Sequence, residues 1–173
     1  MARAIETDPL SGVAHWHVGY VNMILRHYDT AIAALEKLVI LDPSYGPAYP
    51  ILFQLYFLKG DETRSFEVRT NRVNSAAWRT TLENAYRTQG IRGVFAAEAE
   101  EEIRLRGQWR VRAYRIAERL AVSGDTERAL QFLELAYVNR SIGLSVIAAH
   151  PLFASLRAEP RFQALVKKVG FNK

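Results

Sequence analysis

The sequence predicts an all-α protein, an α-solenoid of antiparallel helical hairpins closed by a C-terminal helical cap. The first observation is a repeat, because the dipeptide Asp-Pro occurs at Asp8 and again at Asp42, with the two prolines 34 residues apart. Two apolar segments lie between them, and two helices in about 34 residues is a period typical of helical repeats. The second observation is that apolar residues recur at spacings of three and four, as on one face of a helix.

Composition bounds the class of protein. With 173 residues and 49% apolar residues, the chain can bury a sizeable core, as one domain or as a repeat array. The absence of cysteine excludes a disulfide framework and a thiolate metal site. Apolar runs such as residues 51–58 are too short to cross a bilayer. We therefore expect a soluble, cytoplasmic protein without a membrane segment.

The net charge of +5 comes from arginines scattered along the chain, often beside glutamates, rather than from a basic tail. This pattern favours an ordinary solvated surface over a nucleic-acid-binding surface. We therefore expect no nucleic acid among the partners of this segment.

The first hairpin is expected over residues 11–42. Ser11 is a suitable N-cap for its first helix, and Asp29 or Thr30 can cap its second. Gly19 weakens a helix interior unless a close contact requires it, so we expect the small Ala31 of the second helix to lie opposite. Residues 1–9 are interpreted as the end of a truncated helix from a longer protein, with a natural N-terminus as the alternative.

Three further hairpins follow the same plan with weaker repeat marks. Their expected turns contain glycine, at Gly60, Gly90 and Gly124. Together with the first hairpin, the expected units of the single domain are residues 11–42, 45–73, 75–106 and 109–139.

The acidic stretch near residue 100 predicts a solvated helix. Glu100 with Arg104 and Glu102 with Arg106 are spaced four residues apart, with the acid on the N-terminal side, and such pairs support an exposed helix. Acid–base chemistry would need a pocket and an opposing group, so we interpret these carboxylates as structural.

The end of the chain is expected to be a cap over residues 141–173. Pro160 can begin a short helix and Gly170 can end it. Repeat arrays need such a cap because the last unit has no neighbour to cover its apolar face. The side chains expected to cover the last hairpin are Phe153, Leu156, Phe162 and Leu165.

The first hairpin resembles a tetratricopeptide repeat. The small, aromatic, alanine and proline positions of that family's pattern match Gly19, Tyr28, Ala31 and Pro43. The sequence departs from the pattern at His15, where the family favours a large aromatic residue. The resemblance implies a right-handed superhelix of helical hairpins that binds a protein or peptide.

The C-terminal residues 151–165 also resemble a family ending. Their pattern, Pro-Leu-Phe-x-x-Leu-Arg-x-x-Pro-Arg-Phe-x-x-Leu, is similar to the end of bacterial regulators. In those proteins, tetratricopeptide-like repeats follow a winged-helix, adenylate-cyclase-like or protein-kinase module. The resemblance implies that this chain is the interaction or regulatory segment of a larger bacterial protein.

The resemblance also places a binding groove, since the first helix of each tetratricopeptide hairpin lines a concave surface. Trp16 and Tyr20 occupy positions where chaperone-binding members carry basic and asparagine residues, which disfavours chaperone binding. An aromatic groove suits an apolar or helical peptide. Alternatively, the chain itself or a second subunit covers these side chains. The expected groove residues are Val13, Trp16, Tyr20, Met23, Gln54, Phe57, Tyr114 and Glu118.

A second candidate surface is basic. Arg112, Arg115 and Arg119 share a helix face that could receive an acidic partner, although a regular face of this kind is also typical of an ordinary solvated helix.

Catalytic and metal-binding patterns are absent from the sequence. His15 and His17 are two residues apart, so on a helix they point away from each other. No glycine-rich phosphate loop and no H-E-x-x-H or G-x-S-x-G motif occurs. We expect a non-enzymatic protein without metal or cofactor. A helical domain that binds a small ligand and a dimerisation platform remain alternatives to peptide binding.

Overall fold

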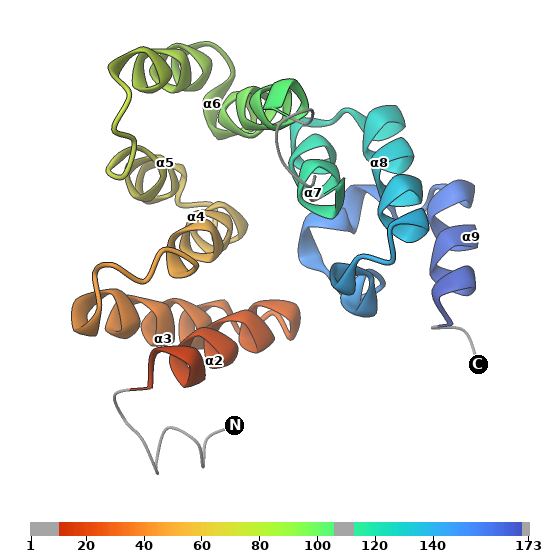
Figure 1. Ribbon diagram of the computed structural model, residues 1–173, viewed down its shortest axis with the longest axis horizontal. Coiled ribbons are helices and arrows are strands. Elements are labelled where there is room, and N and C mark those ends of the chain that lie inside the picture. Colours follow the sequence, from red (N-terminus) through yellow and green to blue (C-terminus); the bar gives the residue numbers. More distant parts are fainter. Residues whose placement is uncertain (1–10, 106–112, 171–173) are drawn as a thin grey trace. The chain divides into compact units, whose positions relative to one another are not determined.

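The computed structural model describes residues 11–105 and 113–170, and these residues form helices and turns without a β-strand. The all-α class predicted from the sequence is therefore confirmed for the described part of the chain. Contacts divide the chain between Arg79 and Thr80 into two compact units. The course of the helices can be followed in Figure 1.

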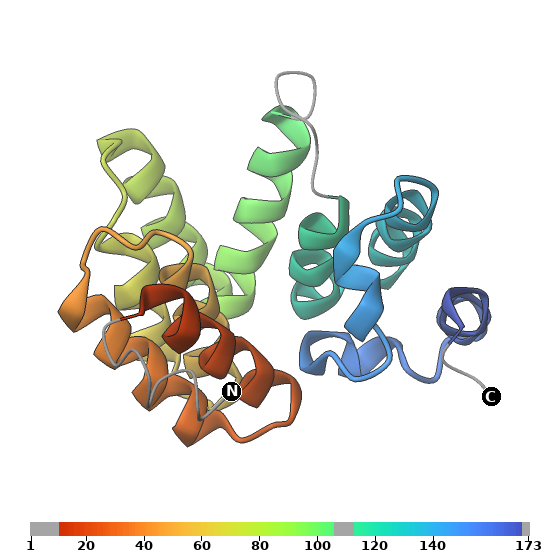
Figure 2. The same cartoon turned by 60° about the horizontal axis from the view of Figure 1, so that its bottom comes forward.

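The first unit consists of two pairs of helices. Helix α2 (Gly12–Ile24) packs against α3 (Tyr28–Leu41), α4 (Ala48–Leu58) packs against α5 (Glu62–Thr70), and α3 also contacts α4 (Figures 1 and 2). Its core draws on apolar side chains from three helices, which include Met23, Ala31, Leu35, Leu38, Leu52 and Leu55.

The close contact at Gly19 differs from the prediction. A Cβ atom at Gly19 would lie 2.4 Å from Cγ of Leu35, so the glycine makes room for a leucine one turn after Ala31. Both Ala31 and Leu35 are fully buried. The helices approach closely as expected, but the side chain packed onto Gly19 is the large Leu35.

Side chains cap the N-termini of two helices in the first unit, α2 and α5, but not those of α3 and α4. The Ser11 hydroxyl accepts a hydrogen bond from the backbone N–H of Ala14 at 3.3 Å, as an N-cap does. Asp61 caps α5 in the same way by accepting from the N–H of Arg64 at 3.1 Å. Helix α3 already begins at Tyr28, and its N-cap residue His27 makes no side-chain cap bond, so the predicted cap at Asp29 or Thr30 is wrong.

Helix α6 (Ala76–Arg104) changes direction at Gly90, the position where the sequence predicts a break. Gly90 has φ 62° and ψ −157°, a conformation that strains residues with a side chain. Just after this break, a Cβ atom at Gly93 would lie 2.5 Å from the carbonyl oxygen of Ala85. The two arms of α6 therefore approach each other closely on either side of Gly90.

The rest of the second unit is a helix pair with its cap. Helix α7 (Ala113–Ser123) packs against α8 (Thr126–Val138), and Asp125 caps α8 by accepting from the N–H of Arg128. The short 3-10 helices η2 (Ile142–Val146) and η3 (Pro151–Leu156) and helix α9 (Pro160–Val169) follow.

The cap covers the last helix pair as predicted. Phe153, Leu156, Phe162 and Leu165 belong to one buried cluster with residues of α7 and α8 such as Leu133. Helix α9 begins at Pro160, and Gly170 ends it in a left-handed conformation with φ 95°. A second link between α9 and α8 is polar, because the guanidinium of Arg161 bonds the carboxylates of Glu127 and Glu134.

Several predictions concern features beyond these observations. The right-handed superhelix and the single domain stay predictions. The truncated helix over residues 1–9 lies outside the described residues, as do 106–112 and the last three residues of the predicted cap.

Candidate functional site

The aromatic side chains predicted on the first helix form a fixed platform, the α2 face, defined by Val13, Trp16 and Tyr20. The rings of Trp16 and Tyr20 are stacked, with centroids 5.3 Å apart and planes 3° from parallel. The indole N–H of Trp16 donates to the carbonyl of Pro47 at 3.1 Å, which ties the ring to the start of α4. Both rings are half-buried, and Val13 is 56% exposed.

Two other predicted groove residues of the first unit are buried, which corrects the expectation that they face a ligand. Met23 is fully buried and packs in the core of the first unit. Gln54 is buried in α4, and Phe57, one turn further on, is half-buried. The α2 face and the half-buried Phe57 are therefore the parts of the predicted groove that keep exposed surface in the first unit.

The predicted groove residues of the second unit are also buried, a further correction. Tyr114 packs edge-on against Phe153 with ring centroids 5.4 Å apart, and a Cβ atom at Gly143 would lie 2.5 Å from its ring. Glu118 is buried beside His150, with 3.3 Å between a carboxylate oxygen and Nε2. The C-terminal cap thus occupies the space in which a ligand of Tyr114 and Glu118 was expected.

His150 is neutral at physiological pH although a carboxylate lies beside it. Burial lowers the pKa of His150 from 6.5 to about 4, since the fully enclosed imidazole cannot be hydrated when charged. Among the described residues, neither ring nitrogen has a hydrogen-bond partner, and the approach to Glu118 is a contact between a neutral ring and an acid. Because both side chains are buried, this pair affects the stability of the fold and is not an exposed reactive site.

The predicted arginine face is corrected as well, because its described members bind acids of the chain itself. Arg119 is buried and lies 3.0 Å from Glu98 and 3.3 Å from Glu102. Arg115 lies 2.7 Å from Glu102. Arg112 lies outside the described residues. An acidic partner would find Arg119 already enclosed and neutralised.

The acidic helix pairs differently from the four-residue spacing predicted for it. Arg104 bonds Glu101 at 2.7 Å, three residues earlier, instead of Glu100. Glu102 bonds the arginines of α7, and its predicted partner Arg106 lies outside the described residues. This stretch of α6 is thus partly a helix interface, where the sequence predicted a solvated surface.

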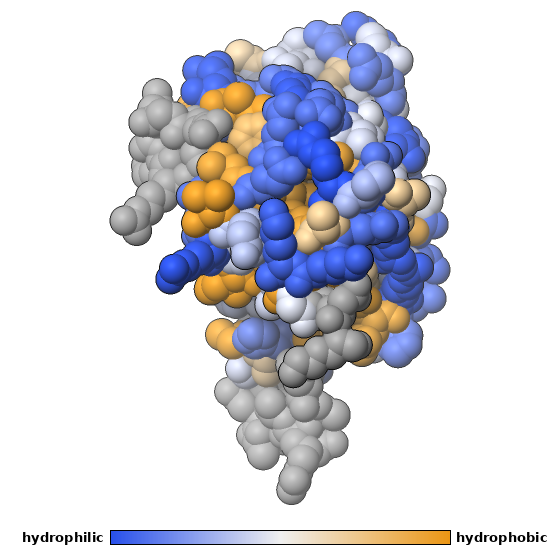
Figure 3. Space-filling view, turned by 90° about the vertical axis from the view of Figure 1, so that its right-hand side faces the viewer, coloured by the Kyte–Doolittle hydropathy of each residue, from blue (hydrophilic) through white to orange (hydrophobic). Residues whose placement is uncertain are grey.

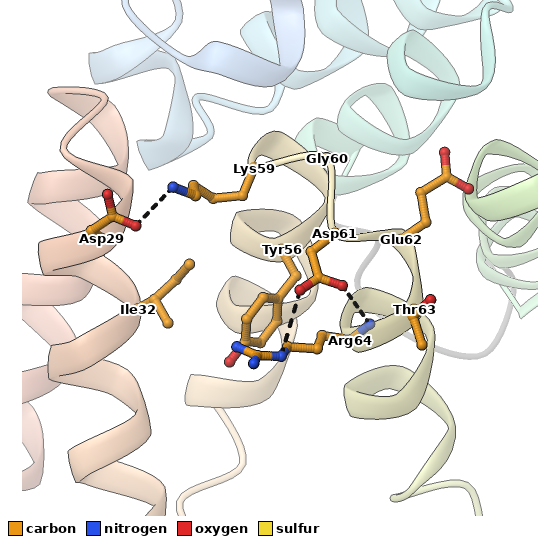
Figure 4. A pocket seen from close by; sticks show the side chains of 9 residues that line it. All are labelled: Asp29, Ile32, Tyr56, Lys59, Gly60, Asp61, Glu62, Thr63 and Arg64. Carbon is orange, nitrogen blue, oxygen red and sulfur yellow. Dashed lines mark hydrogen bonds and ion pairs between the residues drawn. The ribbon is translucent and has the colours of Figure 1, made fainter.

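A hollow of about 550 Å³ lies beside the turn between α4 and α5, next to the start of α3 (Figure 4). Its lining is mainly polar, with Ile32 and the ring of Tyr56 as apolar parts. Sequence reasoning identified the turn at Gly60 but not the hollow, because Asp29 and Lys59 lie on different helix pairs.

Two pairs of opposite charges in this hollow neutralise each other, and the lining also contains the carboxylate of Glu62. Lys59 lies 2.8 Å from Asp29, and Arg64 lies 3.5 Å from Asp61, as the dashed lines in Figure 4 show. The Tyr56 hydroxyl donates to Glu36, and burial, together with this bond and the charge of Glu36, raises the pKa of Tyr56 to about 12. A charged ligand would have to break these contacts, so the hollow is a weaker candidate than the α2 face.

The described residues contain neither a candidate metal site nor a helix that could span a membrane. Among the described residues, no group of three or more His, Asp or Glu side chains could hold a metal ion. Within the same ranges, no helix combines the length and apolar character needed to cross a membrane.

No protein-family model matches the sequence, and no curated protein is similar to it. Interpretation of the site therefore depends on its geometry.

Proposed function

We propose that this chain is a non-catalytic helical scaffold that binds a protein or peptide, with the α2 face as the contact surface. The observation that supports the proposal is the stacked, half-exposed pair of Trp16 and Tyr20, held in place by the bond from Trp16 to Pro47. Tryptophan and tyrosine contribute much of the binding energy in protein interfaces, and a platform fixed in advance loses little entropy on binding.

The chemistry of the face indicates the kind of partner. Val13, Trp16 and Tyr20 present aliphatic and aromatic surface with no charged group among them. Successive side chains one helical turn apart match an apolar stripe of the same spacing on a partner helix. We therefore propose an apolar or helical peptide segment as the partner.

The C-terminal resemblance is the basis for proposing which kind of larger protein contains this scaffold. Residues 151–165 are similar to the ending of bacterial regulators in which repeats follow an effector module. We propose that the chain is the interaction segment of such a regulator, in the cytoplasm. The sequence upstream of residue 1 in the parent gene tests this part, because a winged-helix, cyclase or kinase module there is the expected result.

The binding proposal is tested by selection from a random peptide library on the immobilised chain. We expect enrichment of apolar, helix-forming peptides by the wild type and loss of their binding in Trp16→Ala combined with Tyr20→Ala. Trp78→Ala is the matched control, since Trp78 is also half-buried but lies at the start of α6. Helicity and melting temperature are measured for every variant.

The outcomes separate this proposal from its rivals. If the double variant unfolds, Val13→Ser replaces it, because that exposed side chain contributes little to the core. Wild-type affinity retained in Val13→Ser, or equal losses in the Trp78→Ala control, would contradict the proposal. A mass that rises with protein concentration, and does so only when the α2 face is intact, would instead indicate a dimerisation platform.

A further inference from the structure

A second hollow, of about 780 Å³, lies in the second unit, where the ends of α8 and α9 border η2. We call it the η2 hollow, and the lining residues used below are Val138, Arg140, Ile142, Leu144, Lys168 and Val169. It shares no residue with the α2 face, and the inference drawn from it does not depend on the proposed function.

The apolar part of the η2 hollow is unusually open to water. Ile142 is 91% exposed and Val138 is 74% exposed, and Leu144 and Val169 lie deeper. The space-filling view from the side of α9 shows apolar residues exposed between hydrophilic ones (Figure 3). Covering such side chains with a partner is favourable, so grouped exposed apolar residues mark interaction surfaces.

The charged part of the η2 hollow is basic and lacks counter-charges. Among the described residues, Arg140 and Lys168 are the only charged ones that line it, and none of the described carboxylates does so. In the part of the chain that the structure describes, neither side chain makes an ion pair or hydrogen bond. The hollow beside Gly60 is different, because there both Lys59 and Arg64 meet an acid of the chain itself.

We propose that the η2 hollow binds a segment of a partner protein in which an aliphatic or aromatic side chain is flanked by aspartate or glutamate. The carboxylates complement Arg140 and Lys168, and the apolar side chain covers Ile142 and Val138. A peptide fits better than a free fatty acid, because pockets for small ligands enclose most of the ligand and this lining stays open.

The test measures fluorescence anisotropy of a labelled peptide with a repeated Asp-Leu-Glu-Phe sequence added to the full chain. The expected result is saturable binding that weakens as salt is added. Two comparison peptides replace the acids by Asn and Gln, or the apolar residues by Gly and Ser, and both are expected to bind more weakly. Equal binding of all three peptides would overturn the proposal.

Matched variants locate the binding. Arg140 has a left-handed backbone with φ 51°, which asparagine tolerates, so Arg140→Asn combined with Lys168→Gln removes both charges and keeps the turn. The control is Arg26→Asn combined with Lys167→Gln, because Arg26 has φ 63° at the end of α2 and Lys167 precedes Lys168. We expect a loss of roughly fivefold or more in the first pair, and no loss in the control.

A second pair of variants tests how much apolar contact contributes to binding of the peptide. Ile142→Ser is expected to weaken the peptide about tenfold, since burial of this side chain would be lost. Ile40→Ser is the control, because Ile40 is 77% exposed on α3 in the first unit. Both side chains are exposed, so the fold is expected to survive both changes.

Three further results would overturn the proposal. The first is full affinity in both η2-hollow variants, and the second is an equal loss in the controls. The third is binding of phosphatidylglycerol vesicles that requires Ile142 while the peptide fails to bind, which would assign the hollow to a membrane surface.

Discussion

The guanidinium of Arg119 lies 3.0 Å from the carboxylate of Glu98, and the two side chains are only 6% and 5% exposed. Burial opposes the charge on Arg119, but the carboxylates of Glu98, Glu102 and Glu118 outweigh it and raise the pKa of the guanidinium. A buried pair of this kind ties α7 to α6, and its two members depend on each other.

Removal of one partner of this pair is expected to destabilise the protein strongly. In Arg119→Met, Glu98 is left buried without its cation, and we expect a loss of about 3–5 kcal/mol in the free energy of unfolding. The measurement is urea unfolding followed by circular dichroism. Removing both charges, in Arg119→Met with Glu98→Leu, is expected to restore only part of the loss, because the buried charge of Glu98 is gone while Glu102 and Glu118 still lack the arginine.

The exposed pair of Arg104 and Glu101 provides the control. Its arginine is largely in water, so Arg104→Met is expected to have little effect on unfolding. If Arg119→Met proved as mild as Arg104→Met, the buried pair would not hold α7 to α6.

The burial of His150 predicts a loss of stability in mild acid. The unfolded chain binds a proton at this residue below pH 6.5, whereas the folded chain binds it only near pH 4. The contribution is therefore complete above pH 6.5 and is lost as the pH falls toward 4. Between pH 7 and pH 5 we expect a loss of about 2 kcal/mol from this residue.

Comparison of the wild type with His150→Leu isolates this effect. Urea unfolding at pH 7 and pH 5 gives the drop in free energy for each protein, and the drop is expected to be smaller in the variant. Equal drops would mean that His150 gains a proton in the folded protein as easily as in the unfolded one, for example through Glu118.

Gly19→Ala is expected to destabilise the first unit although alanine favours helices. The added methyl group would lie 2.4 Å from Cγ of Leu35, and overpacking of this kind costs about 1–3 kcal/mol. The gain in helix propensity is about 1 kcal/mol, so we expect a net loss. Thermal unfolding measures it, with Gly46→Ala as the control because no atom lies within 4 Å of the added group.

A melting temperature raised by Gly19→Ala would contradict the packing of α2 on α3. It would mean that Leu35 moves aside without cost and that helix propensity decides the outcome.

The features predicted best from the sequence are those that depend on residues close together in the chain, such as helix ends. The start of α9 at Pro160 and its end at Gly170 follow from residues with strong backbone preferences, and so does the break at Gly90. The cap was predicted because the apolar side chains of Phe153 and Phe162 are stabilised by burial, and both are buried in the structure. These signals act within a few residues, so they can be identified without knowing the packing of the helices.

The sequence predicted poorly what depends on contacts between helices. The pairing of Arg119 with Glu98 joins residues 21 positions apart, and the spacing of arginines on one helix does not show which face meets another helix. Met23 and Tyr114 were placed in a groove by repeat position, but their burial depends on neighbours such as Leu35 and Phe153. The exposed Ile142 was expected to lie in the cap, with no sign of the hollow beside it.

The most direct measurement of peptide binding at the α2 face is fluorine NMR of the chain labelled with 5-fluorotryptophan. The chain has three tryptophans, and single Trp→Phe variants assign their resonances. On saturation with a peptide selected by the wild type, we predict that the Trp16 resonance shifts and that the other two stay in place. An unmoved Trp16 resonance in the presence of saturating peptide would contradict the account.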